Sequence, residues 1–322
     1  MKILIIKLGA LGDMIMASPI IRRIQQHHEN DSIHLLTTPA FAGLFKDWHG
    51  LKIQAFPRKG PGSLWQSLRW LRKQRFDRLY DLQSNDRSGL LCAVSGVPAR
   101  AGNHPRFPYH LHPHEPYVGQ CHAYERLQQI LISAGIEPSH EPPQLPVTPE
   151  TRLHIKKWLD VTELASSRFV LLHAGASLKH ASKRWPYFLD LALALQSKGF
   201  QVIWIGANDD TEVNRALAAR TGIDATALFD VTELAELGKH AGFAVTNDSA
   251  PMHILSCSGI PVFGLFGPTN WRRSHALGQR QRVITPTSVA DINAQKNVFK
   301  PQALDELSVR QVLERLNHDG VI

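Results

Sequence analysis

Short apolar runs alternate with amphipathic segments along the whole chain. Continuous apolar runs of about four to eight residues are typical of buried strands, and apolar positions three and four residues apart are typical of helices. The alternation predicts an α/β protein, in which helices connect the strands of parallel sheets. In the first half, the expected strands and helices lie at 2–6, 32–37, 51–56 and 77–82, and at about 14–28, 39–46, 63–75, 86–95 and 122–135, respectively.

A proline-rich, polar stretch at 136–149 interrupts this alternation, as linkers between domains do. We therefore expect two Rossmann-like domains, residues 1–150 and 151–322, and a cleft between them where the carboxyl ends of the two sheets face one another. In the second half, the expected strands and helices lie at 168–173, 200–205, 243–246 and 260–265, and at about 151–165, 186–198, 210–221, 231–241, 250–258 and, as a C-terminal helix, 303–317.

The composition, with 43% hydrophobic and 20% charged residues, provides for packed cores and excludes a disordered chain. A formal net charge of +8 predicts an anionic partner, and ten cations against three acids fall between residues 58 and 106. We expect Arg58, Lys59 and Arg87 to contact an anionic acceptor or a membrane surface. A solvated helix face is the usual explanation for the cations at 69–75. Because no nucleic-acid reader motif is present, nucleic acid is not an expected partner.

The N-terminal segment does not have the pattern of a signal peptide, because Lys7 and Asp13 interrupt its apolar run. No window of the sequence approaches the roughly 18 apolar residues of a membrane span. The three cysteines form no C-x-x-C pair, and an odd number does not suit a disulfide scaffold. We therefore expect a cytoplasmic protein that is at most peripheral at the membrane.

The first candidate site is the turn 9–13, Gly-Ala-Leu-Gly-Asp, between the first expected strand and the first expected helix. Its glycines allow a ligand to approach the backbone, and the start of a helix offers free N–H groups. The turn has neither the G-x-G-x-x-G pattern of dinucleotide-binding proteins nor a Walker lysine. A dinucleotide or nucleoside triphosphate is therefore not expected in this half. Asp13 stands at the mouth of the turn and is a candidate for catalysis, with a helix N-cap as the alternative.

In the second half, two loops carry groups that suit a diphosphate. One loop runs from His173 through small residues to the cations of 183–186, and the other, 246–253, has an Asp-Ser pair before an expected helix. Because the carboxyl ends of parallel strands meet at one sheet edge, the two loops together predict a nucleotide-phosphate site. An ordinary basic loop and a helix cap are the alternatives for the two loops.

Asp209 and Asp210 follow the expected strand at 200–205. An acidic residue at this place in such a fold binds ribose hydroxyls. Helix capping is the alternative, and a metal site is not expected because adjacent carboxylates point in different directions. The alternating histidines at 110–114 lie in a proline-rich loop without cysteine partners and do not predict a metal site either. No G-x-S-x-G elbow or Ser-His-Asp order supports hydrolase chemistry.

Five ordered segments carry a resemblance that no single motif provides. They are KLGALGD at 7–13, YDLQ at 80–83, KRWP at 183–186, NDSAPMH at 247–253 and FGPT at 266–269. Together they resemble glycosyltransferase family 9, the ADP-heptose:lipopolysaccharide heptosyltransferases, over nearly the whole chain. The resemblance implies a GT-B fold with two facing Rossmann-like domains, the acceptor site in the first domain and the nucleotide-sugar site in the second.

The resemblance also implies an activity: inverting, metal-independent transfer of a heptose from ADP-heptose to the inner core of lipopolysaccharide, without a cofactor. Asp13 matches the family's general base, and Lys183 matches its phosphate-contacting lysine. The other donor-binding residues that it implies are Ser177, Asp210, Asp248, Ser249 and Ala250, the last in place of the family's usual glycine. An acidic or phosphorylated lipid-linked core sugar as acceptor, at the inner-membrane surface, would account for the basic region.

Two other classes of function stay open at the level of sequence. A Rossmann-type NAD-binding oxidoreductase would need a G-x-G-x-x-G pattern after a strand, which this sequence lacks. A non-catalytic sugar-nucleotide-binding relative would have a decayed site, whereas Asp13, Lys183 and Asp248 are all present.

Overall fold

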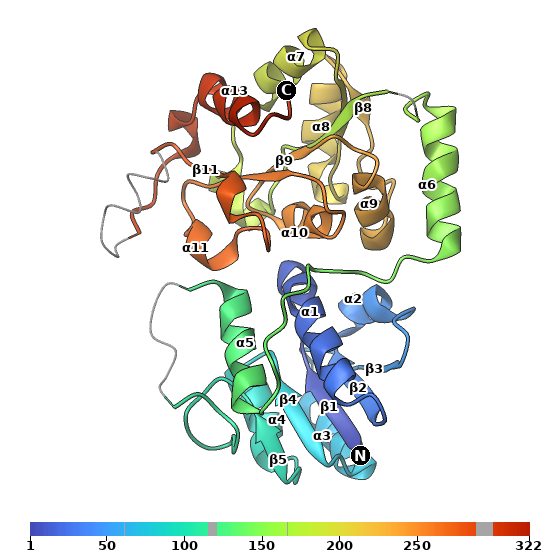
Figure 1. Ribbon diagram of the computed structural model, residues 1–322, viewed down its shortest axis with the longest axis vertical. Helices are drawn as coiled ribbons and strands as arrows, with labels where there is room; N and C mark the ends of the chain where they lie inside the picture. The colour runs from blue at the N-terminus through green and yellow to red at the C-terminus, as the bar shows by residue number, and fades with distance from the viewer. Residues whose placement is uncertain (61, 115–120, 166, 288–298) are drawn as a thin grey trace. The chain divides into compact units, whose positions relative to one another are not determined.

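The computed structural model describes residues 1–60, 62–114, 121–165, 167–287 and 299–322. The chain forms two compact units, Met1–Pro146 and Val147–Ile322, which divide within the proline-rich stretch at 136–149 (Figure 1). Each unit has a parallel sheet and a buried apolar cluster of its own, so the α/β fold class is confirmed. Among the helices of the described ranges, none is long and apolar enough to cross a bilayer.

The first unit has a sheet of five parallel strands in the order β3-β2-β1-β4-β5. In the central strand, Ile5 lies between Leu35 of β2 and Tyr80 of β4. The apolar run of this strand is continuous because helices cover both faces of a parallel sheet. The strands are β1 (Lys2–Ile6), β2 (Ser32–Thr37), β3 (Leu51–Ala55), β4 (Arg78–Asp81) and β5 (Ala99–Ala101). The helices are α1 (Leu11–His27), α2 (Pro39–Ala42), α3 (Ser63–Gln74), α4 (Asp86–Val94) and α5 (Ala123–Ser133), with the 3-10 turn η1 (Gly43–Phe45).

The second unit has a sheet of six parallel strands in the order β11-β10-β9-β6-β7-β8. The strands are β6 (Phe169–His173), β7 (Gln201–Trp204), β8 (Ile223–Asp224), β9 (Ala244–Asn247), β10 (Val262–Leu265) and β11 (Val283–Ile284). The α-helices are α6 (Pro149–Val161), α7 (Phe188–Ser197), α8 (Thr211–Ala218), α9 (Val231–Gly238), α10 (Ala250–Ser256), α11 (Trp271–Ser274) and α13 (Val309–His318). The 3-10 turns are η2 (Leu178–Lys183), η3 (Asn208–Asp210), η4 (Arg280–Arg282) and η5 (Leu304–Glu306).

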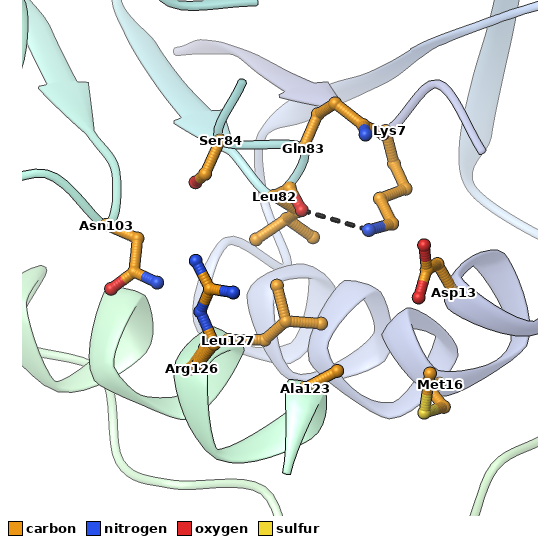
Figure 2. A pocket seen from close by; sticks show the side chains of 10 residues that line it. All are labelled: Lys7, Asp13, Met16, Leu82, Gln83, Ser84, Asn103, Ala123, Arg126 and Leu127. Carbon is orange, nitrogen blue, oxygen red and sulfur yellow. Dashed lines mark hydrogen bonds between the residues drawn. The ribbon is translucent and has the colours of Figure 1, made fainter. Parts of the chain in front are cut away.

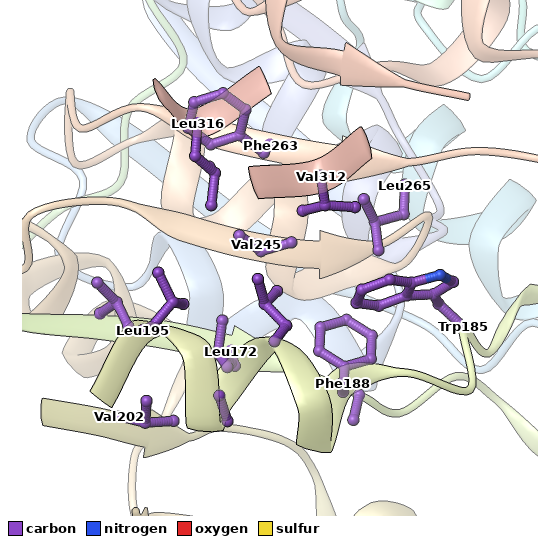
Figure 3. Close-up of a cluster of buried hydrophobic side chains, with 14 of the residues drawn as sticks. Leu172, Trp185, Phe188, Leu195, Val202, Val245, Phe263, Leu265, Val312 and Leu316 are labelled. Atoms are coloured by element: carbon purple, nitrogen blue, oxygen red, sulfur yellow. The ribbon is translucent and has the colours of Figure 1, made fainter. Parts of the chain in front are cut away.

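The core of the second unit lies where α7 and α13 pack on one face of its sheet (Figure 3). Phe188 of α7 and Val312 of α13 meet Leu172 of β6 and Val245 of β9, and all four side chains are buried. Each such side chain stabilises the fold by about 1.5–3 kcal/mol relative to an exposed one. Trp185 belongs to the same cluster, which fixes the loop after η2 to the core.

Some elements differ from the expected ones. The sequence pattern does not predict β5, β8 and β11, because two or three residues are too few to show a period. The C-terminal helix begins at Val309 rather than at residue 303. Ser308 is its N-cap residue, and its hydroxyl accepts a hydrogen bond from the N–H of Gln311 at 3.3 Å. The first helix begins at Leu11 rather than near residue 14, so Asp13 lies in its first turn.

Candidate functional site

In the second unit, the carboxyl ends of β9, β6 and β7 are neighbours in the sheet, and polar residues that end or follow these strands lie together. His173 is the last residue of β6, and Asn247 is the last residue of β9. Asp210 follows β7 at the end of η3. Neighbouring parallel strands thereby bring together residues that are far apart in the sequence, at the edge where α/β proteins bind ligands.

The carboxamide of Asn247 joins the two loops that the sequence predicts to bind phosphate. It is fully buried, and its Nδ2 donates to the carbonyl oxygens of Ala174 and Gly175, both at 3.0 Å. Its Oδ1 accepts from the backbone N–H of Trp185 at 3.1 Å. One side chain therefore holds both ends of the loop between β6 and α7.

Trp185 anchors the same loop from its other side. Its ring is 2% exposed and lies edge-on to the ring of Phe188, with centroids 5.1 Å apart. Its Nε1 donates to the carbonyl of Leu307 at 2.7 Å. Because a buried indole needs a partner for its N–H, this contact fixes the tryptophan, and hence the nearby Lys183, in one position.

Lys183 forms an ion pair with Asp248, with 2.7 Å between Nζ and Oδ2. The same carboxylate oxygen accepts a hydrogen bond from Oγ1 of Thr269 at 2.7 Å. The Lys183 side chain is 20% exposed and that of Asp248 is 8% exposed, so the ammonium faces solvent more than its partner does. Three predicted motifs, 183–186, 247–253 and 266–269, thus meet at one carboxylate.

His173 links two of the predicted donor-binding residues. Its Nδ1 lies 3.0 Å from Oγ of Ser249, and its Nε2 lies 3.4 Å from Oδ2 of Asp210. Ser249 is the N-cap residue of α10, but its hydroxyl does not cap the helix and instead also bonds the carbonyl of Asn247 at 3.2 Å. The capping alternative for Ser249 is therefore wrong. No local spacing in the sequence reveals this chain of contacts, because its members come from three separate loops.

Asp210, not Asp209, is turned into this cluster. Asp210 is 5% exposed and accepts the N–H of Ala207 at 3.0 Å, whereas Asp209 is exposed. A Cβ on Gly175 would lie 1.9 Å from Oδ1 of Asp210, so only glycine leaves room for this carboxylate. Burial alone would raise the pKa of the Asp210 carboxyl, but the hydrogen bonds from His173 and Ala207 bring the pKa below its usual value.

The remaining two predicted donor residues have simpler surroundings. Ser177 is exposed, and it precedes η2 without capping it through its hydroxyl. Ala250 is the first residue of α10 and is half-buried. The structure does not link these two side chains to the contacts around His173 and Lys183, and their roles stay predictions.

The first unit has a pocket of about 150 Å³ beside the start of α1 (Figure 2). The pocket is mostly polar and contains charged side chains of both signs. Its lining residues are Lys7, Asp13, Met16, Leu82, Gln83, Ser84, Asn103, Ala123, Arg126 and Leu127.

Asp13 reaches this pocket from the third position of α1. Ala10, not Asp13, is the N-cap residue, so Asp13 does not cap the helix as its N-cap residue but from the third position. The carboxylate instead accepts the N–H of Ala10 at 3.2 Å and remains half-exposed. The preceding Gly9 has a φ of +122°, and a Cβ there would lie 2.4 Å from the ring of Phe41, so this tight entry to the helix requires glycine.

Lys7 lines the same pocket beside Asp13 and is a candidate that the sequence pattern does not reveal (Figure 2). It is 6% exposed, and its Nζ donates to the carbonyl of Leu82 at 3.1 Å (Figure 2). Burial lowers the pKa of the Lys7 ammonium, against the opposing influence of the Asp13 and Asp81 carboxylates. The signal in the sequence was a single charge at the end of an apolar strand.

Asp81 does not line the pocket but holds two residues that do, Gln83 and Ser84. It is fully buried at the end of β4, and its Oδ1 accepts the N–H groups of Gln83 at 3.0 Å and Ser84 at 2.9 Å. The hydroxyl of Tyr109 donates to its Oδ2 at 2.5 Å. Burial raises the pKa of the Asp81 carboxyl, against these hydrogen bonds. Asp81 therefore fixes the loop whose Leu82 carbonyl holds Lys7.

The three predicted acceptor-binding cations do not line the pocket of Asp13. Arg58 and Lys59 are exposed after β3. Arg87 donates to the carbonyl of Pro57 at 3.4 Å and to Oγ of Ser63 at 3.1 Å, so it supports this loop. Within the described ranges there is also no group of three or more His, Cys, Asp or Glu side chains placed to hold a metal ion.

Comparison with known proteins identifies the family. Residues 63–306, well over half of the chain, match the sequence model of glycosyltransferase family 9 (heptosyltransferase). The chain belongs to glycosyltransferase family 9. Lipopolysaccharide heptosyltransferase 2 of Escherichia coli (strain K12) is 26% identical to this family 9 member over 347 residues, covering 98% of each chain. The resemblance drawn from five motifs is confirmed, and the protein is a glycosyltransferase.

Two solved structures share the fold of this family 9 glycosyltransferase. The glycosyl transferase family 9 protein from Veillonella parvula DSM 2008 has a TM-score of 0.83 at 19% identity, covering 98% of this chain and 96% of that chain. The E. coli heptosyltransferase WaaC with ADP-2-deoxy-2-fluoro heptose has a TM-score of 0.71 at 17% identity, covering 99% and 100%. With two Rossmann-like units, the GT-B fold class is confirmed.

A substitution of Asn247 tests whether its buried amide holds the loop between β6 and α7 in this family 9 enzyme. In Asn247→Asp, the introduced carboxyl cannot donate to both carbonyls, so we expect a loss of about 2 kcal/mol or more in the free energy of unfolding, measured by urea denaturation. Asn317→Asp makes the same chemical change at an exposed position of α13 and should lower the free energy of unfolding by only a few tenths of a kcal/mol. Equal stability of the two variants would contradict the role of Asn247.

Proposed function

We propose that this family 9 glycosyltransferase transfers a heptose from ADP-heptose to the inner core of lipopolysaccharide, with inversion and without a metal ion. The proposal is carried by the match to lipopolysaccharide heptosyltransferase 2 over 98% of both chains. A relative of the same fold was solved with ADP-2-deoxy-2-fluoro heptose, which supports an ADP-sugar donor. The NAD-dependent oxidoreductase and the non-catalytic relative are not favoured, since the family is one of glycosyltransferases.

The second unit is the proposed donor site. In this proposal, Asp210 accepts hydrogen bonds from the ribose hydroxyls. The diphosphate and the sugar are surrounded by Ser177, Asp248, Ser249 and Ala250. The Oδ2 atom of Asp210 is already held by His173 and Ala207, which fixes the direction of the carboxylate before the donor arrives. A carboxylate held in this way needs little reorganisation on binding.

Lys183 supplies the charge that the departing ADP requires. As the bond to the anomeric carbon breaks, negative charge grows on the diphosphate, and a positioned cation stabilises it. The ammonium donates to Oδ2 and to the backbone carbonyl of Asp248, which hold it in place, and its third N–H remains for a phosphate oxygen. A divalent ion is then not needed, because the diphosphate charge is met by protein groups.

The first unit is the proposed acceptor site, with Asp13 as the general base. A sugar hydroxyl is a weak nucleophile at neutral pH, so a carboxylate within hydrogen-bond reach must accept its proton as it attacks. A single displacement on the side opposite to ADP inverts the anomeric centre. The pocket of Asp13 supports this role, because it is polar and of a size that suits part of a sugar.

The acceptor in this proposal is larger than one sugar. A second pocket of about 290 Å³ shares Ser84, Asn103 and Arg126 with the pocket of Asp13 and extends to Phe107 and Pro108. The shared residues make the two pockets neighbours, which supports an oligosaccharide acceptor. Arg58, Lys59 and Arg87 remain predicted contacts of its anionic groups, at the cytoplasmic face of the inner membrane.

A transfer assay tests this function. We expect the protein, in the presence of EDTA, to move heptose from ADP-heptose to a truncated lipopolysaccharide core, with the product detected by mass spectrometry and its anomeric configuration by NMR. Other nucleotide sugars and differently truncated cores serve as controls. Failure with every core would contradict the function, and activity that returns only with added Mg²⁺ would contradict the metal-free mechanism.

The role of Asp13 is tested by Asp13→Asn, which keeps an oxygen for the N–H of Ala10 but cannot take a proton from the acceptor. We expect kcat to fall by about 10²–10⁴, with donor affinity and Tm nearly unchanged. Glu125→Gln is a matched control, because Glu125 also occupies the third position of its helix and accepts the N–H of the N-cap residue His122 at 3.3 Å. Near-normal kcat in Asp13→Asn would place the base elsewhere.

A further inference from the structure

The exposed face of α3 combines an aromatic side chain with a row of cations. Trp65 is 64% exposed, which is unusual for a tryptophan. Arg69, Arg72 and Lys73 are also exposed. They follow Trp65 by four, seven and eight residues, so the period of 3.6 residues per turn places all of them on the same side of the helix.

The opposite face of α3 holds the helix firmly on the first unit. Leu68 and Leu71 are buried in the apolar cluster beneath the helix. Arg72 donates through Nε to the carbonyl of Val94, at 2.9 Å, which ties α3 to the end of α4. The orientation of the exposed face is therefore fixed by the fold and does not depend on a partner.

The cations of this face have no acidic partners among the described residues. Neither Arg69, Arg72 nor Lys73 forms an ion pair, and neither do Arg58 and Lys59 just before the helix. The arginines of α13 behave differently, since the exposed Arg310 pairs with Glu314 at 2.7 Å and the half-buried Arg315 pairs with Asp319 at 3.2 Å. Ion pairs among the described residues therefore do not neutralise the positive charge of α3.

A favourable interaction with the helix dipole explains only part of this pattern. Cations in the last turn, Arg72 and Lys73, stabilise the carboxyl end of a helix. Neither Arg69 nor Trp65 lies in that turn, and an exposed indole does not contribute to helix stability. The whole face has the composition of a helix that lies at a membrane interface, where cations meet anionic headgroups and tryptophan enters the headgroup level.

We propose that the exposed face of α3, with Trp65 at its amino-terminal end, docks this protein onto anionic phospholipid headgroups. The cations supply electrostatic attraction, and Trp65 supplies the apolar contact that makes the attachment specific for an interface. The inference rests on the proposed function only in that a lipid-linked acceptor requires the enzyme at a membrane. Lipid binding itself requires neither donor nor acceptor.

Co-sedimentation of the full chain with vesicles tests the docking face without any substrate. We expect binding to mixed phosphatidylglycerol–phosphatidylcholine vesicles and little binding to phosphatidylcholine alone. The double variant Arg69→Glu and Lys73→Glu should lower the vesicle partition coefficient by about 25-fold or more. Each cation near an anionic surface raises this coefficient by about fivefold, and both cations are lost. Raising the salt from about 0.15 M to about 1 M should weaken wild-type binding, because the Debye length falls from about 8 Å to about 3 Å.

A matched control separates the face of α3 from net charge alone. Lys156 and Lys157 are exposed on α6 of the second unit, and reversing both to Glu changes the net charge by the same amount. This variant should retain most of the binding. Equal loss in the two double variants, or no binding of the wild type to anionic vesicles, would overturn the proposal.

Variants of Trp65 distinguish docking on a membrane from binding to another kind of anionic partner. Trp65→Ala should lower vesicle binding by about tenfold through the lost apolar contact, with Tm unchanged, and Trp65→Phe should restore much of it. Vesicle binding that is indifferent to Trp65, or stronger binding of a single-stranded RNA that depends on the same residues, would overturn the assignment to a membrane. Transfer to a soluble acceptor without its lipid should be normal in these variants, so failure of the docking face and failure of the proposed function give different results.

Discussion

The carboxamide of Asn247, buried at the end of β9, bonds three backbone groups of a loop that lies more than sixty residues away in the sequence. Buried polar groups must be paired, so the side chain fixes where the loop after β6 runs. The positions of Lys183, through Trp185, and of Gly175 beside Asp210 follow from this constraint. The proposed donor site depends on it throughout.

In the first unit, charged groups hold the loop that follows β4. Asp81 at the end of β4 accepts the backbone N–H groups of Gln83 and Ser84, and the carbonyl of Leu82, in the same loop, holds the ammonium of Lys7. A buried lysine beside the half-exposed carboxylate of Asp13 gives the pocket charges of both signs. In both units, the end of a parallel strand supplies the polar residue that shapes the site.

The sequence predicts the fold class and most strands well, because both faces of the long strands are buried and their apolar runs are continuous. It does not predict β5, β8 and β11, where two or three residues carry no period. Among candidate residues, the contact of Lys183 with Asp248 joins two loops that the sequence had paired. The links through His173, Lys7 and Thr269 were missed, because each depends on contacts between loops that no local spacing records.

The central claim is that the loops joined by Asn247 bind the ADP part of the donor. Amide hydrogen exchange of the full chain, measured with and without ADP, tests it most directly. We expect slower exchange in residues 174–184, 206–211 and 247–251 of the second unit when ADP is present. Protection confined to the turn 9–13 of the first unit, with these three segments unchanged, would contradict it.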